Sequence, residues 1–462
     1  MTSPTVIIGG GIMGMVTAAL LRKRHPGKPI YIIEQSDHAG GLYTSMYYPE
    51  GGYFDYGMHI LYDTGIEEVD TFLHSLLPSD QWHILEGNHK DIAGIFWNGI
   101  LQYHSPYLDL RTLPEEELRR CIEGVYEAAR VKSASTPDDA KRYFEEHFGK
   151  PAAMYWQEVI EKLYGVPADQ VSVWATRQPA MNRVILKNTN AMQDVMQSPD
   201  LRARIAYPDQ MQLPSIRTTS QCGWYPKQFG MIHVINALER HLITSDVKFI
   251  FNAQVEQLTI QNNRISAMSV CSERSAPIIL EGVEYCYWTA GMASLGSLLG
   301  TSVNKIVHQK QAKAAHLHLR FAEPPRMGSL YQLYCFDVRY KTFRVTNYAN
   351  YCHAAHNAKG YPLCLEYWPN EPMPDHMILK QAMDELRVFG VIPEGTLPTF
   401  SAIKHVHNHH YMFLRSFMDE SARIRHSIHQ AGIKNLITIG ISAGEGRLLF
   451  YEVLMDAYHK LR

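Results

Sequence analysis

A glycine-rich turn between two predicted strands most strongly constrains the fold of this chain. An apolar run that predicts a buried strand leads into the spacing G-x-G-x-x-G, a predicted helix follows, and a second apolar strand ends in an acid. Such a turn lets a pyrophosphate approach the backbone, the helix N-terminus offers free N–H groups, and the acid can accept a ribose hydroxyl. The pattern therefore predicts a dinucleotide site rather than a glycine-rich turn without a ligand. Its parts are residues 6–8, Gly9, Gly11 and Gly14, residues 15–24, residues 30–33 and Glu34.

The residues after Glu34 indicate which dinucleotide is bound. Gly40 and Gly41 follow the acid after a short spacer, and Leu42 and the hydroxyl residue Thr44 come next. This arrangement resembles the flavoprotein superfamily of amine oxidases, protoporphyrinogen oxidase, phytoene desaturase and UDP-galactopyranose mutase. The resemblance implies a tightly bound FAD, with the Gly-Gly pair passing its phosphates or ribitol.

A second segment, residues 53–62, resembles the mutase-like, sugar-modifying branch of the same superfamily. Phe54, Asp55, Tyr56, Gly57 and His59 match its pattern F-D-x-G-x-H. The resemblance implies that the histidine lies against the flavin ring, and a glycine at this place would let the backbone pass close to it. The imidazole could hydrogen-bond near the flavin or the substrate, or shift charge near the flavin N5. A histidine satisfied by core hydrogen bonds is the alternative.

The end of the chain is predicted to return to the cofactor. Residues 435–440 predict a last buried strand, and a turn and a helix follow it. Gly446, Arg447 and Leu448 resemble the G-R-L motif of the mutase branch, whose turn lies over the ribitol and the flavin O2. An alignment that starts at Gly440 is also open. The resemblance makes Arg447 a candidate contact of the flavin or of a phosphate.

The middle of the chain contributes further candidates. In the superfamily, the residue at Val255 presents its backbone to the adenine, and Ala290-Gly291 follow a strand before a flavin-side turn. A strand containing Arg344 resembles one that faces the substrate in the mutase branch. Its guanidinium could bind a phosphate or carboxylate with two parallel hydrogen bonds, or be an ordinary surface arginine.

Taken together, the motifs and the resemblance define two sets of candidate site residues. The catalytic candidates are His59, Arg344 and Arg447. The cofactor-binding candidates are Gly9, Gly11, Ile12, Met13, Gly14, Glu34, Gln35, Gly40, Gly41, Leu42, Tyr56, Gly57, Met58, His59, Val255, Ala290, Gly291, Gly440, Gly446, Arg447 and Leu448.

The predicted fold is α/β, with a discontinuous Rossmann-like (GR2-type) FAD-binding domain, a helical insert and an antiparallel-sheet substrate domain. Charged helical patterns interrupt the α/β alternation after residue 105, and strand patterns dominate residues 308–366. The expected boundaries are 1–105, 215–300 and 421–462 for the three parts of the FAD-binding domain, 106–214 for the insert and 301–420 for the substrate domain.

Composition excludes several other classes. A formal net charge of −2 argues against a nucleic-acid partner, and no apolar run reaches the roughly 18 residues of a membrane span. The 7 cysteines form no C-x-x-C pair, and the apolar start lacks a basic leader, so we expect a cytoplasmic protein with reduced thiols. His405, His407 and His409 alternate along a predicted strand, but no nearby acid or cysteine completes a metal site, so no metal is expected.

Three functions remain open from the sequence. The first is an FAD-dependent oxidoreductase or mutase-like enzyme, with chemistry at the flavin N5, that acts on a sugar-like or nucleotide-linked small molecule. The second is an amine oxidase or desaturase type of enzyme that takes hydride from a C–N or C–C bond. The third is a non-catalytic flavin-fold protein that scaffolds a partner. The expected partner is a small-molecule substrate; a homodimer and reduction of the flavin by NAD(P)H are left open.

Overall fold

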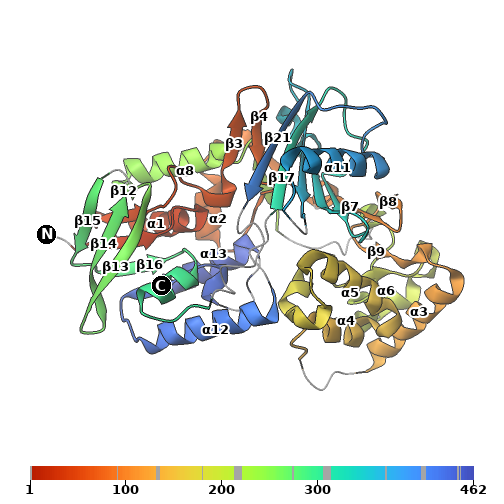
Figure 1. Cartoon of the computed structure of the whole chain (residues 1–462), viewed down its shortest axis with the longest axis horizontal. Helices are drawn as coiled ribbons and strands as arrows, with labels where there is room; N and C mark the ends of the chain where they lie inside the picture. The colour runs from red at the N-terminus through yellow and green to blue at the C-terminus, as the bar shows by residue number, and fades with distance from the viewer. Residues whose placement is uncertain are drawn as a thin grey trace.

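The protein is described here by a computed structural model, in which an α/β part, a β-sheet part and a helical part lie side by side (Figure 1). Both ends of the described chain lie in the α/β part, as Figure 1 shows. The structure describes residues 3–90, 92–131, 136–178, 180–212, 221–272, 275–304, 314–369, 372–406, 413–444, 447 and 449–461.

A five-stranded parallel sheet forms the centre of the α/β part. Its strand order is β12-β2-β1-β16-β22, with bounds β1 (Thr5–Ile8), β2 (Ile30–Ile33), β12 (Val247–Ile250), β16 (Tyr285–Trp288) and β22 (Leu436–Thr438). Ile7 is buried on one face of the sheet, and Val6 and Ile8 are buried on the other. Because both faces are covered, the sequence of β1 is an uninterrupted apolar run.

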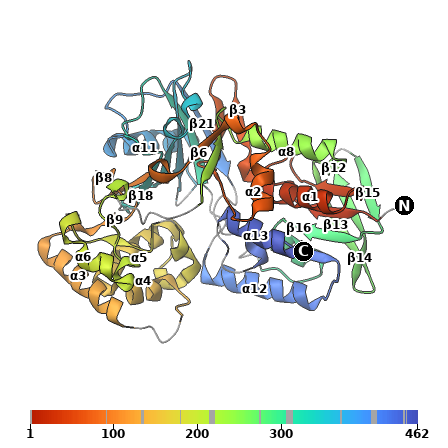
Figure 2. The ribbon, with the colours of Figure 1, turned by 180° about the vertical axis from the view of Figure 1, so that it is seen from behind.

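Helices and a smaller sheet cover the two faces of this parallel sheet. Helices α1 (Ile12–Arg24), α8 (Ile232–Thr244) and α13 (Phe450–Lys460) pack on the face of Ile7. The face of Val6 and Ile8 packs against α9 (Met292–Leu298), α12 (Arg415–Gln430) and the antiparallel sheet of β13 (Ala253–Gln261), β14 (Arg264–Ser272) and β15 (Ser275–Glu281). From behind, α1, α2 (Glu67–His74) and α13 lie together (Figure 2), and Tyr458 of α13 donates a hydrogen bond to Glu68 of α2 (2.9 Å).

The β-sheet part is a seven-stranded, mostly antiparallel sheet in the order β21-β17-β20-β19-β18-β7-β8. Among the strands that the structure describes in this sheet, β18 and β7 pair in parallel and the other pairs are antiparallel. The β7–β8 hairpin turns at Asn98-Gly99, both at positive φ, as the Asn-Gly pair predicts. The bounds are β7 (Ala93–Trp97), β8 (Ile100–Gln102), β17 (Ala314–Phe321), β18 (Gln332–Cys335), β19 (Thr342–Asn347), β20 (Tyr361–Tyr367), β21 (Phe400–Val406) and the covering helix α11 (Asp375–Val388).

The helical part has a core of its own around Trp156, which is fully buried. Its main helices are α3 (Glu115–Arg130), α4 (Ala140–Phe148) and α5 (Lys150–Tyr164), within the segment 106–214 where the sequence predicts a helical insert. Gly149, at φ +72°, separates α4 from α5, and a Cβ there would come within 2.6 Å of the Gly124 carbonyl oxygen in α3. The glycine is therefore required both for the turn and for the close helix packing. Shorter elements complete this part: β9 (Leu108–Asp109), β10 (Val184–Ile185), α6 (Gln193–Gln197) and α7 (Pro199–Arg202).

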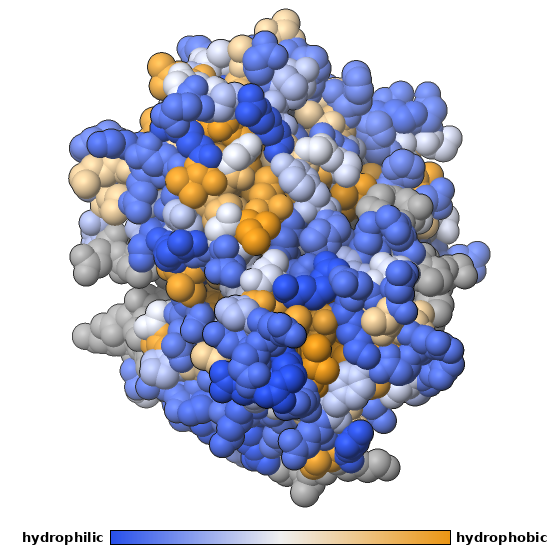
Figure 3. Space-filling view, turned by 90° about the vertical axis from the view of Figure 1, so that its right-hand side faces the viewer, coloured by the Kyte–Doolittle hydropathy of each residue, from blue (hydrophilic) through white to orange (hydrophobic). Residues whose placement is uncertain are grey.

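Two small sheets connect the α/β and β-sheet parts. The hairpin of β3 (Ser45–Tyr48) and β4 (Gly52–Asp55) packs beside the seven-stranded sheet, and β5 (Leu61–Tyr62), β11 (Gly223–Pro226) and β6 (Trp82–Leu85) form a three-stranded sheet. Seen from the side of the insert and the β7–β8 edge, the surface is mainly hydrophilic with scattered apolar patches (Figure 3). Among the described residues, no helix has both the length and the apolar character that crossing a bilayer requires.

Candidate active site

The glycine-rich turn has the geometry that the sequence predicts. Gly9 leaves β1 at φ +105°, and a Cβ on Gly14 would come within 2.0 Å of the Gly9 carbonyl oxygen, so α1 can approach the strand only with glycine there. The backbone N–H of Gly10 donates to Glu34 Oε2 (2.6 Å), and that of Ser36 donates to Glu34 Oε1 (2.8 Å). The carboxylate is thus fixed at the end of β2, beside the turn, with its remaining lone pairs available for a ribose hydroxyl.

An open space lies over Gly11, at the start of α1. A Cβ on Gly11 would meet no atom within 4 Å, and its φ of −64° suits any L residue. The first N–H groups of α1, at Ile12, Met13 and Gly14, have no partner within the helix by helix geometry. Open space in front of free N–H groups and a positive helix end fits a pyrophosphate.

The Gly-Gly pair predicted to pass the cofactor lies against this turn. Gly40 donates its N–H to the Gly10 carbonyl oxygen (2.9 Å), and a Cβ on Gly41 would stand 3.4 Å from Gly11 Cα. Both glycines have positive φ, and Leu42 after them is partly exposed. Residues far apart in the sequence therefore lie together around the open space over Gly11, a region that we call the dinucleotide crevice.

The carboxyl ends of three parallel strands meet at this crevice. Ala290 and Gly291 follow β16, and nothing lies within 4 Å of where a Gly291 Cβ would be. Gly440 follows β22 at φ +127°, after Ile439 donates its N–H to the Trp288 carbonyl oxygen (2.8 Å). Ligands of open α/β sheets bind outside such strand ends, at the point where the strand order reverses.

Other predicted cofactor residues lie at the edge of the crevice. Val255 is in β13, which begins next to Glu34, because Ala253 donates its N–H to the Glu34 carbonyl oxygen (3.0 Å). Gln35 is exposed just after β2. These positions agree with a site that extends along the end of β2 toward β13.

The segment of Tyr56, Gly57, Met58 and His59 leads from the α/β part toward the seven-stranded sheet. A Cβ on Gly57, at φ +75°, would come within 2.5 Å of Glu366 Oε1 and 3.2 Å of Arg344 Nη2. His59 contacts Tyr43, which follows the Gly-Gly pair, with ring centroids 4.8 Å apart. This segment therefore joins the dinucleotide crevice to polar groups of the sheet.

Those polar groups form a row across the sheet, which we call the polar row: Tyr334, Arg344, Glu366 and His316. They are neighbours in register on β18, β19, β20 and β17, so their side chains share one face. Both Nε and Nη2 of Arg344 lie close to Glu366 Oε1, at 2.6 and 2.5 Å, and the Glu366 side chain is fully buried. Arg344 is therefore a paired, mostly buried arginine, and the alternative of an ordinary surface arginine does not hold.

Asp55 fixes the segment that leads to Gly57. Its carboxylate accepts hydrogen bonds from Ser45 Oγ (2.5 Å), Tyr225 OH (2.6 Å) and the Met231 N–H (3.0 Å). Burial raises the pKa of Asp55 from 3.8 to about 6, although the three hydrogen bonds lower it. One buried acid thus ties β3, β4, β11 and α8 together next to the crevice.

The C-terminal candidates are only partly described. Arg447 Nη2 pairs with Asp456 Oδ1 of α13 at 2.6 Å, a contact that connects Arg447 to this helix. Gly446 and Leu448 lie outside the described residues, as do His407 and His409. His405 Nε2 lies 2.8 Å from Asp375 Oδ1 on the exposed side of the sheet.

The sequence assigns no site role to Glu366, His316, His318 or Cys364, which the structure gathers on the paired strands β17 and β20. A spacing of H-x-H in residues 316–318 is the only local signal for this group. Their proximity depends on the pairing of strands that are about fifty residues apart. That pairing is long-range register, which no local pattern encodes.

Comparison with known proteins agrees with this architecture. Residues 7–76 match the family described as NAD(P)-binding Rossmann-like domain. The crystal structure of reduced UDP-galactopyranose mutase superposes with a TM-score of 0.70 at 15% identity, covering 96% of this chain and 89% of that one. A putative protoporphyrinogen oxidase from Exiguobacterium sp. 255-15 gives 0.65 at 14% identity, covering 100% and 99%. Putrescine oxidase bound to putrescine gives 0.60 at 14%, covering 99% and 98%.

The chain has the fold of the flavoprotein superfamily. The predicted α/β class and the predicted resemblance to the amine oxidase, protoporphyrinogen oxidase and mutase group are confirmed at the level of the fold. The family match over residues 7–76 includes the turn at Gly9–Gly14, so it covers the start of the dinucleotide-binding domain that the sequence predicts.

Proposed function

We propose that this chain is an FAD-dependent enzyme, an oxidoreductase or a mutase-like flavoenzyme, that acts on a sugar-like or nucleotide-linked small molecule. The observation that carries the proposal is the position of Gly57. Gly57 lies two residues before His59, whose ring contacts Tyr43 next to the Gly40-Gly41 pair. A side chain at Gly57 would collide with Glu366 and Arg344 of the polar row. A cofactor held in the crevice and a substrate held by the polar row would therefore meet near this glycine.

The residues around Gly11 fit the phosphate end of FAD. The open space over Gly11, the N-terminus of α1 and the Gly40-Gly41 backbone would hold the pyrophosphate, and Glu34 would accept ribose hydroxyls. We propose that the remaining cofactor contacts come from Tyr56, Met58, His59, Val255, Ala290, Gly291 and Gly440, as the resemblance to the superfamily implies. When bound, FAD supplies the N5 atom, which accepts hydride or, in the reduced cofactor, acts as a nucleophile.

The protein's own groups would orient the substrate. Glu366 fixes the Arg344 guanidinium in one rotamer, so its remaining N–H groups keep a constant direction toward a substrate phosphate, carboxylate or hydroxyl. Since the pair is neutral overall, it favours a polar sugar-like group over a multiply charged anion. Burial of the pair also keeps water away from the reacting atoms. His59 lies on the crevice side of Gly57, where it could hold or move a proton.

The fold comparisons support both chemical versions of this proposal. The likeness to reduced UDP-galactopyranose mutase, with a TM-score of 0.70, supports the version with mutase-like chemistry and no net redox change. The oxidases cover the chain as completely, which keeps net oxidation as the second version. An anaerobic spectrum separates them: bleaching of the flavin by substrate alone indicates oxidation, and turnover that requires pre-reduced flavin indicates mutase chemistry.

Gly11→Ala tests the cofactor part of the proposal. The added methyl group meets no protein atom and fits the backbone conformation, so we expect the apo protein to unfold at the wild-type denaturant concentration. The methyl group would stand in the path of the pyrophosphate, and we expect FAD affinity to fall by about tenfold or more, the equivalent of about 1.4 kcal/mol. Affinity is measured by flavin fluorescence during titration of apo protein. Wild-type protein that stays colourless with added FAD would overturn the proposal.

A further inference from the structure

A second cluster of chemically active side chains shares His316 with the polar row. His316 and His318 are two residues apart on β17, so they point to the same face of the sheet. Cys364 on β20 is directly opposite His318 in the antiparallel register. Opposite residues in such a pair have Cβ atoms about 5 Å apart, which brings two imidazoles and a thiol to one point of the sheet.

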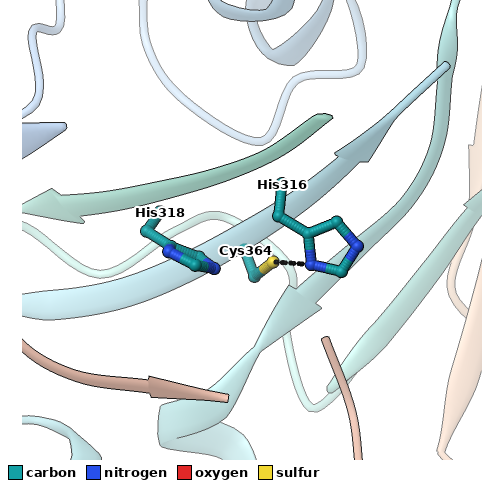
Figure 4. Close-up of side chains that lie close together, drawn as sticks. All are labelled: His316, His318 and Cys364. Atoms are coloured by element: carbon teal, nitrogen blue, oxygen red, sulfur yellow. Dashed lines mark hydrogen bonds between the residues drawn. The ribbon is translucent and has the colours of Figure 1, made fainter. Parts of the chain in front are cut away.

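The structure gathers these three side chains closely. One potential ligand atom from each lies within 4.8 Å of the others, and Cys364 Sγ is 4.0 Å from His316 Nδ1. Figure 4 shows Cys364 between the two imidazole rings. All three residues have no exposed surface, so they are shielded from solvent on every side.

Neighbouring rings hold His318 in a defined orientation. Tyr48 OH lies 3.1 Å from His318 Nδ1, and Phe54 stacks on the ring with centroids 4.8 Å apart. The other ring nitrogen, Nε2, is buried and has no hydrogen-bond partner among the described residues. Burying an imidazole nitrogen without a hydrogen-bond partner costs free energy of folding. In metal sites, one ring nitrogen of a histidine binds the ion while the other is held by a hydrogen bond, as Tyr48 holds Nδ1 here.

We propose that His316, His318 and Cys364 bind a single Zn²⁺ ion. Two imidazoles and a thiolate are the nitrogen and sulfur ligands that zinc prefers, and carboxylate-binding ions such as Mg²⁺ and Ca²⁺ do not suit this set. Neutral imidazole is the form of histidine that ligates zinc, and the buried Nε2 of His318 offers such a nitrogen.

Zinc binding requires Cys364 to lose its proton. A thiol carries a proton that a zinc-bound thiolate lacks. On binding, the S–H bond breaks, the proton leaves to solvent, and the sulfur electron pair forms the Zn–S bond. One proton is released for each ion bound, and no oxidation or reduction takes place.

The site joins the β3–β4 hairpin to the seven-stranded sheet. Tyr48 and Phe54 of the hairpin contact His318, and Cys364 is two residues from Glu366 on the same face of β20. A bound ion would fix His316 of the polar row and the sheet face around it, and none of the residues that bind it belongs to the glycine-rich turn. The proposal is therefore independent of FAD binding.

The test uses the full-length holoprotein with any affinity tag removed. Protein is dialysed against a chelator, loaded with excess ZnCl₂ and passed through a desalting column, and the bound metal is measured by mass spectrometry. We expect one equivalent of zinc per chain. Loading with CoCl₂ instead should give a sulfur-to-cobalt charge-transfer band in the difference spectrum. Wild-type protein that retains no stoichiometric metal and gives no such band overturns the proposal.

Variants assign the ion to these residues. We expect Cys364→Ser to abolish the cobalt band, and both Cys364→Ser and His318→Gln to weaken zinc binding by at least about 100-fold, as loss of a metal ligand should exceed the effect of its supporting residues. Cys286→Ser is the matched control, because Cys286 is equally buried but lies in β16 of the parallel sheet. Retention of zinc and of the cobalt band by Cys364→Ser would overturn the assignment even if His318→Gln fails to fold.

Discussion

The glycine-rich turn and the polar row differ in how they are built. The turn is assembled from residues 9–14 and one acid at the end of the next strand, and its geometry follows from local backbone requirements. The polar row takes one residue from each of four strands between residues 316 and 366, and only strand register brings these residues together. A local site can be recognised from spacing, whereas a register-built site becomes visible only in the folded sheet.

The largest expected effect on stability comes from a substitution in the polar row. Glu366→Gln removes the charge that neutralises Arg344 but keeps the size of the side chain. Since the Arg344 side chain is only 17% exposed, its unpaired charge should lower the free energy of unfolding by about 3–5 kcal/mol. Denaturant titration measures the change.

A surface pair provides the control for this variant. Arg119 pairs with Glu116 within α3, and both side chains are mostly exposed. Glu116→Gln should leave the unfolding transition unchanged, because exposed ion pairs are screened by solvent. Equal effects of the two variants would contradict a buried, energetically important pair in the polar row.

The next effect compares two glycines of the same turn. Gly14→Ala places a methyl group 2.0 Å from the Gly9 carbonyl oxygen, so α1 must move away from β1. We expect a loss of about 3 kcal/mol or more in the free energy of unfolding, at or beyond the upper end for overpacked sites. In contrast, Gly11→Ala should lower only FAD affinity. Similar stability losses for both variants would show that the space over Gly11 is needed by the protein itself.

The smallest expected effect concerns Asp55, which connects the two regions. Its native carboxyl keeps a proton up to about pH 6, whereas the unfolded chain releases it near 3.8. The stabilisation from this proton is thus complete below about pH 4 and is lost as the pH rises through about 6. Relative to Asp55→Asn, wild-type stability should fall over this range by no more than about 3 kcal/mol. Unfolding curves of both proteins at several pH values measure the difference, and a difference that rises with pH would contradict the raised pKa.

The sequence predicts the cofactor side of the fold well, for physical reasons. Buried parallel strands appear as apolar runs such as residues 6–8, and glycines with positive φ or close backbone contacts appear at fixed spacing. The helices of the insert are also predictable, because capping residues and Gly149 mark their ends locally.

The substrate side is less predictable from sequence. Arg344 is a predicted catalytic residue, and that role stays a prediction; the structure shows it paired with Glu366. The sequence does not predict this partner, because the pair depends on the register of β19 with β20. The alternation of histidines at residues 405, 407 and 409 is the pattern considered in the sequence as a metal site, yet His405 is exposed and pairs with Asp375. His316 and His318, with the same alternation, are the buried pair, since β17 is a central strand and β21 an edge strand.

The strand order of the parallel sheet has a consequence for synthesis of the chain on the ribosome. Strand β1 begins at Thr5, but its neighbour β16 begins at Tyr285 and the edge strand β22 at Leu436. A nascent chain emerges at about 5–20 residues per second. The pairing of β1 with β16, and of β16 with β22, is therefore delayed by many seconds after β1 and β2 are synthesised, whereas the helical insert can fold earlier. During this interval the apolar faces of the first strands are exposed, so chaperones that shield nascent apolar segments should act on this N-terminal region before any other.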